Sequence, residues 1–93
     1  MPSIRWSPEA ADDLERIYRR PEADNPAAAL RVVQTIYDAA TTLETFPERG
    51  RLSRRSGARE IAFSPPLPYI LVYRVIGDFV EISRIWHAAQ DWH

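Results

Sequence analysis

The sequence predicts an α+β fold in which a helical hairpin packs on one face of a mainly antiparallel sheet. Two stretches of the N-terminal half have the apolar spacing of amphipathic helices. Each begins with a capping residue followed by proline, at Ser7-Pro8 and Asn25-Pro26. The C-terminal half instead has strand-like segments on both sides of a Gly77-Asp78 turn, which is typical of a β-hairpin. The predicted element order is β-α-α-β-β-β.

A short strand and a helix open the chain. Ile4 and Trp6 alternate with polar residues, which predicts the strand. The following helix begins at Pro8, and we expect it to end at about Arg20 because Pro21 cannot continue it. Its charged residues, Asp13 among them, are expected on the exposed side. Its apolar stripe consists of Ala11, Leu14, Ile17 and Tyr18.

A second helix is predicted from Pro26 to just before Pro47. The connection between the two helices is only about five residues long, so they should lie antiparallel as a hairpin. The predicted buried face comprises Leu30, Val33, Ile36, Tyr37, Ala40, Leu43 and Phe46.

The last part of the chain is predicted as a loop over 47–59 and strands over 60–63, 69–76 and 79–86. A two-residue turn at Gly77-Asp78 places Val72 opposite Ser83 and Ile70 opposite Ile85. This register puts Arg84 on the core side, where a charge is unusual. Either Arg84 pairs with an acid at the edge of the sheet, or a β-bulge turns it outward. The predicted core face is Leu71, Tyr73, Val75, Val80 and Ile82.

Composition limits the class of protein. The 93 residues are enough for one domain, spanning 1–93, and 45% of them are hydrophobic. The absence of cysteine excludes disulfide scaffolds, thiolate metal ligands and cysteine nucleophiles. No apolar run approaches the ~20 residues of a membrane helix, and the N-terminus lacks the apolar core of a signal peptide. We therefore expect a cytoplasmic protein without a membrane partner.

The charge is divided unevenly along the chain. All 12 basic residues are arginine, so no lysine base is available. Residues 1–48 carry a net charge of −4 and residues 49–93 a net charge of +3. The arginines between 49 and 59 either cover a solvated loop or form a contact surface for a phosphate-rich or acidic target. The candidate target-binding residues are Arg49, Arg51, Arg54, Arg55 and Arg74.

Motifs along nearly the whole chain resemble the RelE/ParE toxins of bacterial type II toxin–antitoxin systems. They are Trp6-Ser-Pro-Glu-Ala-Ala-Asp-Asp-Leu14, Asn25-Pro-Ala-Ala, Phe46-Pro-Glu-Arg-Gly50, Arg59-Glu60, Pro68-Tyr-Ile-Leu-Val-Tyr-Arg-Val75 and Arg84-Ile-Trp-His-Ala-Ala-Gln-Asp-Trp92. The resemblance implies a growth inhibitor that is neutralised by a cognate antitoxin, whose disordered segment folds on the toxin.

The family divides by target. The long hairpin and the tail are more similar to the ParE branch, which implies a non-enzymatic toxin that poisons DNA gyrase. The RelE branch implies a ribosome-dependent mRNA endoribonuclease that uses no metal. A third alternative is a binding remnant of the fold that has lost toxicity.

The resemblance also implies roles for particular residues. If the chain is RelE-like, Arg59 and Arg84 would neutralise phosphate and His87 would act as acid or base, with Glu60 in place of the absent lysines. The antitoxin is expected to meet apolar Tyr18, Tyr37 or Trp92. No cofactor is expected, and the two histidines lack metal-ligand spacing.

Overall fold

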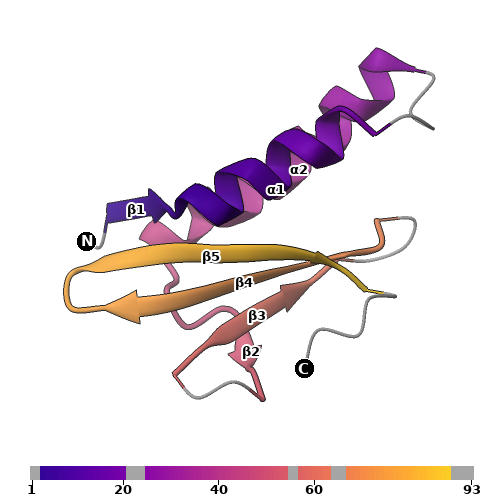
Figure 1. Cartoon of the computed structure of the whole chain (residues 1–93). Coiled ribbons are helices and arrows are strands. Elements are labelled where there is room, and N and C mark those ends of the chain that lie inside the picture. Colours follow the sequence, from indigo (N-terminus) through magenta and orange to yellow (C-terminus); the bar gives the residue numbers. More distant parts are fainter. Residues whose placement is uncertain (1–2, 21–24, 55–56, 64–66, 89–93) are drawn as a thin grey trace.

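The computed structural model describes residues 3–20, 25–54, 57–63 and 67–88. A helical hairpin covers one face of a five-stranded sheet, as Figure 1 shows. The strand order is β1-β5-β4-β3-β2, with β1 parallel to β5 and the other pairs antiparallel. The elements are β1 (Ser3–Trp6), α1 (Pro8–Tyr18), α2 (Pro26–Thr41), the 3₁₀ turn η1 (Thr42–Glu44), β2 (Arg51–Leu52), β3 (Arg59–Ala62), β4 (Tyr69–Ile76) and β5 (Phe79–His87).

The predicted α+β fold and its helix starts are confirmed. Ser7 Oγ accepts a hydrogen bond from the Ala10 amide at 3.0 Å, and the Asn25 side chain accepts from two amides of the first turn of α2. β2 is an addition, because a two-residue strand inside a loop has no alternation to reveal it. Neither described helix is long and apolar enough to cross a membrane.

The core lies between the hairpin and the sheet. Four residues predicted on the buried face of the second helix or on the core face of the sheet are exposed instead: Leu30 by 54%, Tyr37 by 51%, Phe46 by 62% and Val75 by 45%. Leu30 lies on the part of α2 that diverges from the sheet (Figure 1). Phe46 follows η1, where the α-helical period ends, and Val75 lies at the tip of the β4–β5 hairpin. The predicted core residues that are fully buried are Ile36, Ala40, Leu43, Leu71, Tyr73, Val80 and Ile82.

A register shift interrupts the β4–β5 pairing between Val72 and Tyr73. Ser83 is the extra residue of β5, so Val72 pairs with Arg84. The predicted pairs of Val72 with Ser83 and of Ile70 with Ile85 are therefore wrong. The shift turns Ile85 into the core and removes Arg84 from it. The pairs nearest the turn are as predicted: Ile76–Phe79, Val75–Val80, Arg74–Glu81 and Tyr73–Ile82.

Beyond the end of β1, Ser7 and Asp13 bind backbone groups along the edge of β5. The Ser7 amide donates to the Ile82 carbonyl at 3.0 Å, and Ser7 Oγ donates to the Ser83 carbonyl at 2.9 Å. The Asp13 carboxylate accepts from the Ile85 amide at 2.9 Å. Side chains of the helix thus satisfy backbone groups that a neighbouring strand would otherwise bind. Asp13 is buried, and its predicted place on the exposed side of the helix is wrong.

Candidate functional site

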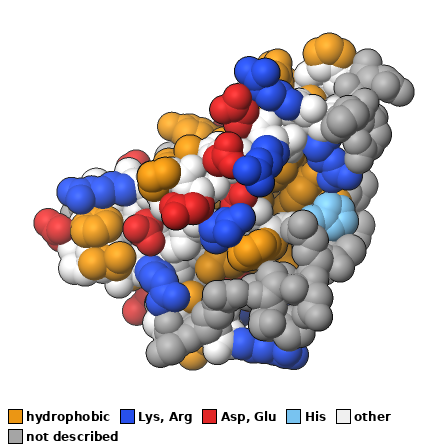
Figure 2. Space-filling view, in the orientation of Figure 1, with side chains coloured by type: hydrophobic (Ala, Val, Ile, Leu, Met, Phe, Trp, Pro, Cys, Tyr) orange, Lys and Arg blue, Asp and Glu red, His pale blue; other side chains and the backbone are white. Residues whose placement is uncertain are grey.

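Three surface regions contain most of the predicted site residues that the structure describes. The hairpin groove lies between α1 and α2, the terminal cleft lies between α1 and the end of β5, and the arginine loop comprises residues 47–54. Figure 2 shows acidic and basic side chains interspersed over the helical side of the molecule and basic ones at its lower edge.

The hairpin groove is apolar and open. It has a volume of about 390 Å³, and Trp6 stacks on Tyr37 in it with ring centroids 6.0 Å apart. Tyr18 and Tyr37 both line it and are about half exposed. Two of the predicted antitoxin contacts therefore share one groove, whereas Trp92 lies outside the described residues. Exposed aromatic rings in an apolar groove are typical of a protein-binding surface.

The terminal cleft contains a bidentate ion pair between Arg84 and Asp13. Arg84 Nε donates to Asp13 Oδ2 at 2.7 Å, and Arg84 Nη2 donates to Asp13 Oδ1 at 3.0 Å. The Asp13 side chain is 8% exposed and that of Arg84 is 35% exposed. The hydrogen bond from Asp13 raises the pKa of Arg84 above its ordinary value. Both alternatives for Arg84 are thus realised, because it follows a bulge and also pairs with an acid at the sheet edge.

His87 lies in the same cleft. Its ring meets the ring of Tyr69 edge-on at 5.6 Å, and the Tyr69 hydroxyl accepts from Arg20 Nη1 at 2.7 Å. The cleft has a volume of about 190 Å³ and is also lined by Arg16 and Arg84. Its cationic lining suits a small anionic group.

The arginine loop is held against the sheet by Tyr73. The Tyr73 hydroxyl accepts from the Gly50 amide at 2.8 Å and donates to the Pro47 carbonyl at 2.9 Å. Arg59 Nη1 donates to the Gly50 carbonyl at 2.8 Å. Burial raises the pKa of Tyr73 above 10.0, so this hydroxyl is neutral and can both donate and accept at neutral pH.

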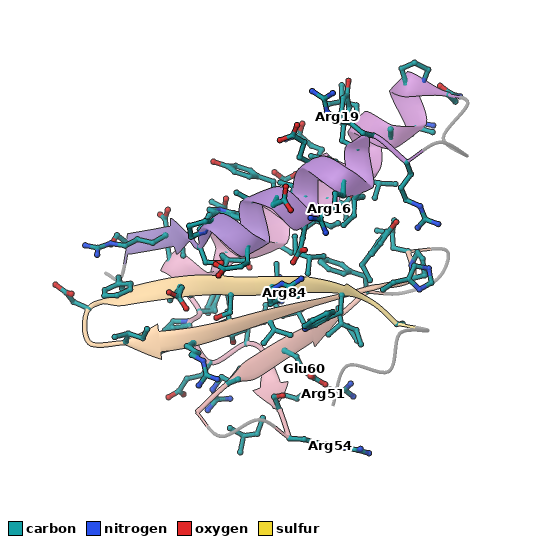
Figure 3. All side chains as sticks on the ribbon, in the orientation of Figure 1. Arg16, Arg19, Arg51, Arg54, Glu60 and Arg84 are labelled. Atoms are coloured by element: carbon teal, nitrogen blue, oxygen red, sulfur yellow. The ribbon has the colours of Figure 1, made fainter. Side chains whose placement is uncertain are left out.

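The predicted target-binding arginines differ in the hydrogen bonds and ion pairs that they make. Arg49 donates to Thr42 Oγ1 at 2.8 Å, and Arg51 lies 2.8 Å from a carboxylate oxygen of buried Glu60. Exposed Arg54 makes no hydrogen bond or ion pair to any other described residue, and it points away from the sheet in Figure 3. Arg55 lies outside the described residues, and Arg74 is half-buried on β4.

The three candidate catalytic residues do not all converge. RNA cleavage needs a base, cations around the phosphate and an acid at the leaving oxygen. Arg84 and His87 line the terminal cleft, but Arg59 does not. Arg59 pairs with Tyr73 and Arg84 with Val72, and consecutive residues of a strand face opposite sides of the sheet. Arg84 is neutralised by Asp13, and the alternative base Glu60 is bound to Arg51.

Sequence reasoning missed Asp13, Arg20 and Tyr73 as residues that build these surfaces. Asp13 follows buried Ala10 by three residues and precedes Ile17 by four, a spacing that places it on the inner face of α1. Arg20 and Tyr73 act through partners distant in sequence, so no local signal identifies them. Among the described residues, no cluster of His, Asp or Glu could hold a metal ion.

Comparison with known proteins identifies the family. The model of the ParE toxin of type II toxin–antitoxin systems, parDE, matches residues 4–92. The chain belongs to this family. It is a toxin of a type II toxin–antitoxin system, as the sequence motifs predict.

Relatives of this ParE-family toxin match it over nearly their whole length. It is 40% identical over 89 residues to the Y4kP protein of Sinorhizobium fredii, covering 96% of this chain and 91% of that protein. It is 37% identical over 90 residues to Toxin RelE2 of Caulobacter vibrioides, covering 97% and 99% of the two chains. A relative of this ParE-family chain is thus named as a RelE toxin.

Solved structures share the fold of this ParE-family toxin. A chain of the chromosomal ParDE system from P. aeruginosa aligns with a TM-score of 0.82 and 31% identity, over 94% of this chain and 96% of that one. The YoeB/ParE toxin from Agrobacterium tumefaciens aligns with a TM-score of 0.63 at 19% identity, over 91% and 96% of the two chains, which shows a common fold alone.

Proposed function

We propose that this ParE-family toxin arrests growth by binding and poisoning DNA gyrase, with the arginine loop as its contact surface. The dispersal of the candidate nuclease residues carries the proposal. Arg59 is bound to the Gly50 carbonyl, while Arg84 is bound to the Asp13 carboxylate in the separate terminal cleft. A toxin that acts by binding needs no assembled acid–base pair.

The charge of the arginine loop supports a phosphate-rich or acidic target. Figure 3 shows Arg51 and Arg54 together at the β2–β3 edge, apart from Arg84. The loop belongs to the half of the chain with a net charge of +3. Such a positive edge increases the rate of encounter with an anionic surface, an effect that falls with ionic strength.

A cognate antitoxin is the second partner in this proposal. Its amphipathic helix lies along the hairpin groove and presents apolar side chains to Tyr18 and Tyr37. The apolar lining of the groove supports this, as does the similarity to a toxin from a ParDE system. This groove and the arginine loop lie on different elements, so antitoxin binding and target binding use different residues.

Two assays run side by side test the target. We expect the toxin to inhibit DNA supercoiling by gyrase and to leave ribosome-bound mRNA intact. Arg54→Glu should weaken inhibition, whereas Arg31→Glu, which reverses an exposed charge on α2, should not. Activity in the mRNA assay alone would contradict the gyrase proposal. Inactivity in both, with antitoxin binding retained, would identify a non-toxic remnant.

An mRNA endoribonuclease is the second candidate, and the terminal cleft favours it. His87 lies there with Arg16, Arg20 and Arg84, a set that combines an acid–base group with cations. His87→Gln should abolish mRNA cleavage if this candidate is correct. The same substitution should leave gyrase inhibition unchanged if the toxin acts through its arginine loop.

A further inference from the structure

Tyr73 places a single hydroxyl group at the base of the arginine loop. Its side chain is fully buried in the centre of the sheet. The hydroxyl donates to the Pro47 carbonyl at 2.9 Å and accepts from the Gly50 amide at 2.8 Å. Pro47 lies within a tight turn over residues 46–49, in which the Arg49 amide donates to the Phe46 carbonyl at 3.0 Å, and Gly50 directly follows that turn. One hydroxyl group therefore holds the chain both within the turn and just after it.

Gly50 allows this close approach. A Cβ atom at this position would lie 2.6 Å from Cε1 of Tyr73 and 2.9 Å from the Glu60 carbonyl oxygen, which are both below van der Waals contact. The backbone of Gly50 therefore lies directly against the phenol ring. Its carbonyl is held from the other side by Arg59 at 2.8 Å. Gly50 immediately precedes β2, so its position sets where Arg51 enters the sheet and where Arg54 follows it.

We infer that Tyr73 is a positioning residue of the toxin, whose hydroxyl orients the arginine loop for its target. The inference rests on the proposed role of that loop as the contact surface. Tyr73 is buried and touches no target itself. Its effect on binding passes through Pro47 and Gly50, which carry the arginines at fixed positions.

Tyr73→Phe removes the hydroxyl and keeps the ring. The Gly50 amide and the Pro47 carbonyl then lose their partner, so the loop samples other positions. We expect about a tenfold loss of toxic potency at equal toxin level, measured by growth arrest from a titratable promoter. Hydrogen exchange at residues 47–54 should accelerate, while exchange along α2 stays unchanged. Gly50→Ala, which forces the loop from the ring but retains the hydroxyl, should have the same two effects.

Ile82→Val is the matched control. Ile82 pairs with Tyr73 across the sheet and is fully buried, and its shortening removes one methylene group without touching the loop. This variant should retain the potency of the original toxin. Equal potency of Tyr73→Phe and the original toxin would overturn the inference. So would an equal loss in Ile82→Val, which would assign the effect to general destabilisation.

Gyrase inhibition, measured on the same variants, separates this inference from the proposed target. If the original toxin arrests growth without inhibiting gyrase, the proposed target is wrong. The growth-arrest comparison of Tyr73→Phe with Ile82→Val still decides whether the hydroxyl positions the loop. If the toxin does inhibit gyrase, the half-inhibitory concentration should rise by the same factor of about ten in Tyr73→Phe.

Discussion

Replacing Asp13 with alanine tests how α1 is attached to the edge of the sheet. The carboxylate makes three contacts at once, two with the Arg84 guanidinium and one with the Ile85 amide. Asp13→Ala removes all three and leaves the amide buried without an acceptor. Asp13→Asn removes the charge but keeps an oxygen that can accept from Ile85.

The contacts set the expected cost of the substitution. An unsatisfied buried amide costs about 1–3 kcal/mol. Arg84 is 35% exposed, so water recovers much of its lost partner and the ion pair adds only about 1 kcal/mol. We therefore expect Asp13→Ala to lower the free energy of unfolding by about 2–4 kcal/mol. Asp13→Asn should cost about 1–2 kcal/mol, because the amide retains an acceptor.

Urea unfolding followed by circular dichroism measures these differences. Asp12→Ala is the control, since the adjacent carboxylate is 53% exposed and, within the described part of the chain, pairs only with exposed Arg16 one helical turn away. It should change stability by no more than about 0.5 kcal/mol. A loss of about 2 kcal/mol lowers the melting temperature by roughly 8–16 °C in a domain of this size. Equal urea midpoints for Asp13→Ala and Asp12→Ala would refute the edge-capping argument.

The remaining predictions address the core, the two surfaces and the response to alkali. Leu43 is fully buried, so Leu43→Ala should cost about 2–5 kcal/mol in the same urea assay, and a loss below about 1 kcal/mol would contradict its assigned packing. The double substitution of Arg54 and Arg55 by Glu should abolish growth arrest without changing the melting temperature. Undiminished arrest would mean that these arginines only cover a solvated loop. Tyr37→Asp should weaken antitoxin binding by at least about tenfold in calorimetry, whereas the unmodified pair should bind with a large negative heat-capacity change. Burial raises the pKa of Tyr73, so the unfolded chain loses this proton first and stability should fall as pH rises above 10.0. Tyr73→Phe should reduce that alkaline fall in a pH series of unfolding curves.

Local signals account for the parts of the fold that the sequence predicts. Ser7-Pro8 and Asn25-Pro26 mark helix starts through bonds made within one turn, and Gly77 adopts the positive φ of 58° that its turn requires. The inner face of α2 follows from spacing alone, which correctly identifies Ile36 and Ala40. Each of these features depends on residues that are close in sequence.

The features that sequence reasoning missed depend on distant partners. The bulge at Ser83 allows the Ile85 side chain to enter the core while Arg84 pairs with Asp13. Carboxylates are seldom buried, so charge alone favours the solvent side for Asp13, although its spacing matches the inner face. The apolar spacing that includes Phe46 continues past Thr41, where the chain tightens into a 3₁₀ turn.

The candidate sites likewise divide into residues that local signals place and residues whose position depends on distant partners. Tyr18 and Tyr37 line one groove, because both lie on the hairpin that the sequence predicts. Only the resemblance to a family with two branches groups Arg59, Arg84 and His87. Their positions relative to the sheet depend on strand register, and a shift of one residue exchanges the two faces. The sequence could therefore name these residues but not place them in one site.

The closed edge of β5 has a consequence for the solubility of the toxin. β5 is longer than β1, and an uncovered stretch of strand recruits other chains into continuous sheets. Ser7 and Asp13 occupy the backbone groups of that stretch from within the same molecule. The toxin therefore resists sheet-to-sheet aggregation along this border even when no partner covers it. Under the proposed function, that protection matters most while the toxin is free of its antitoxin.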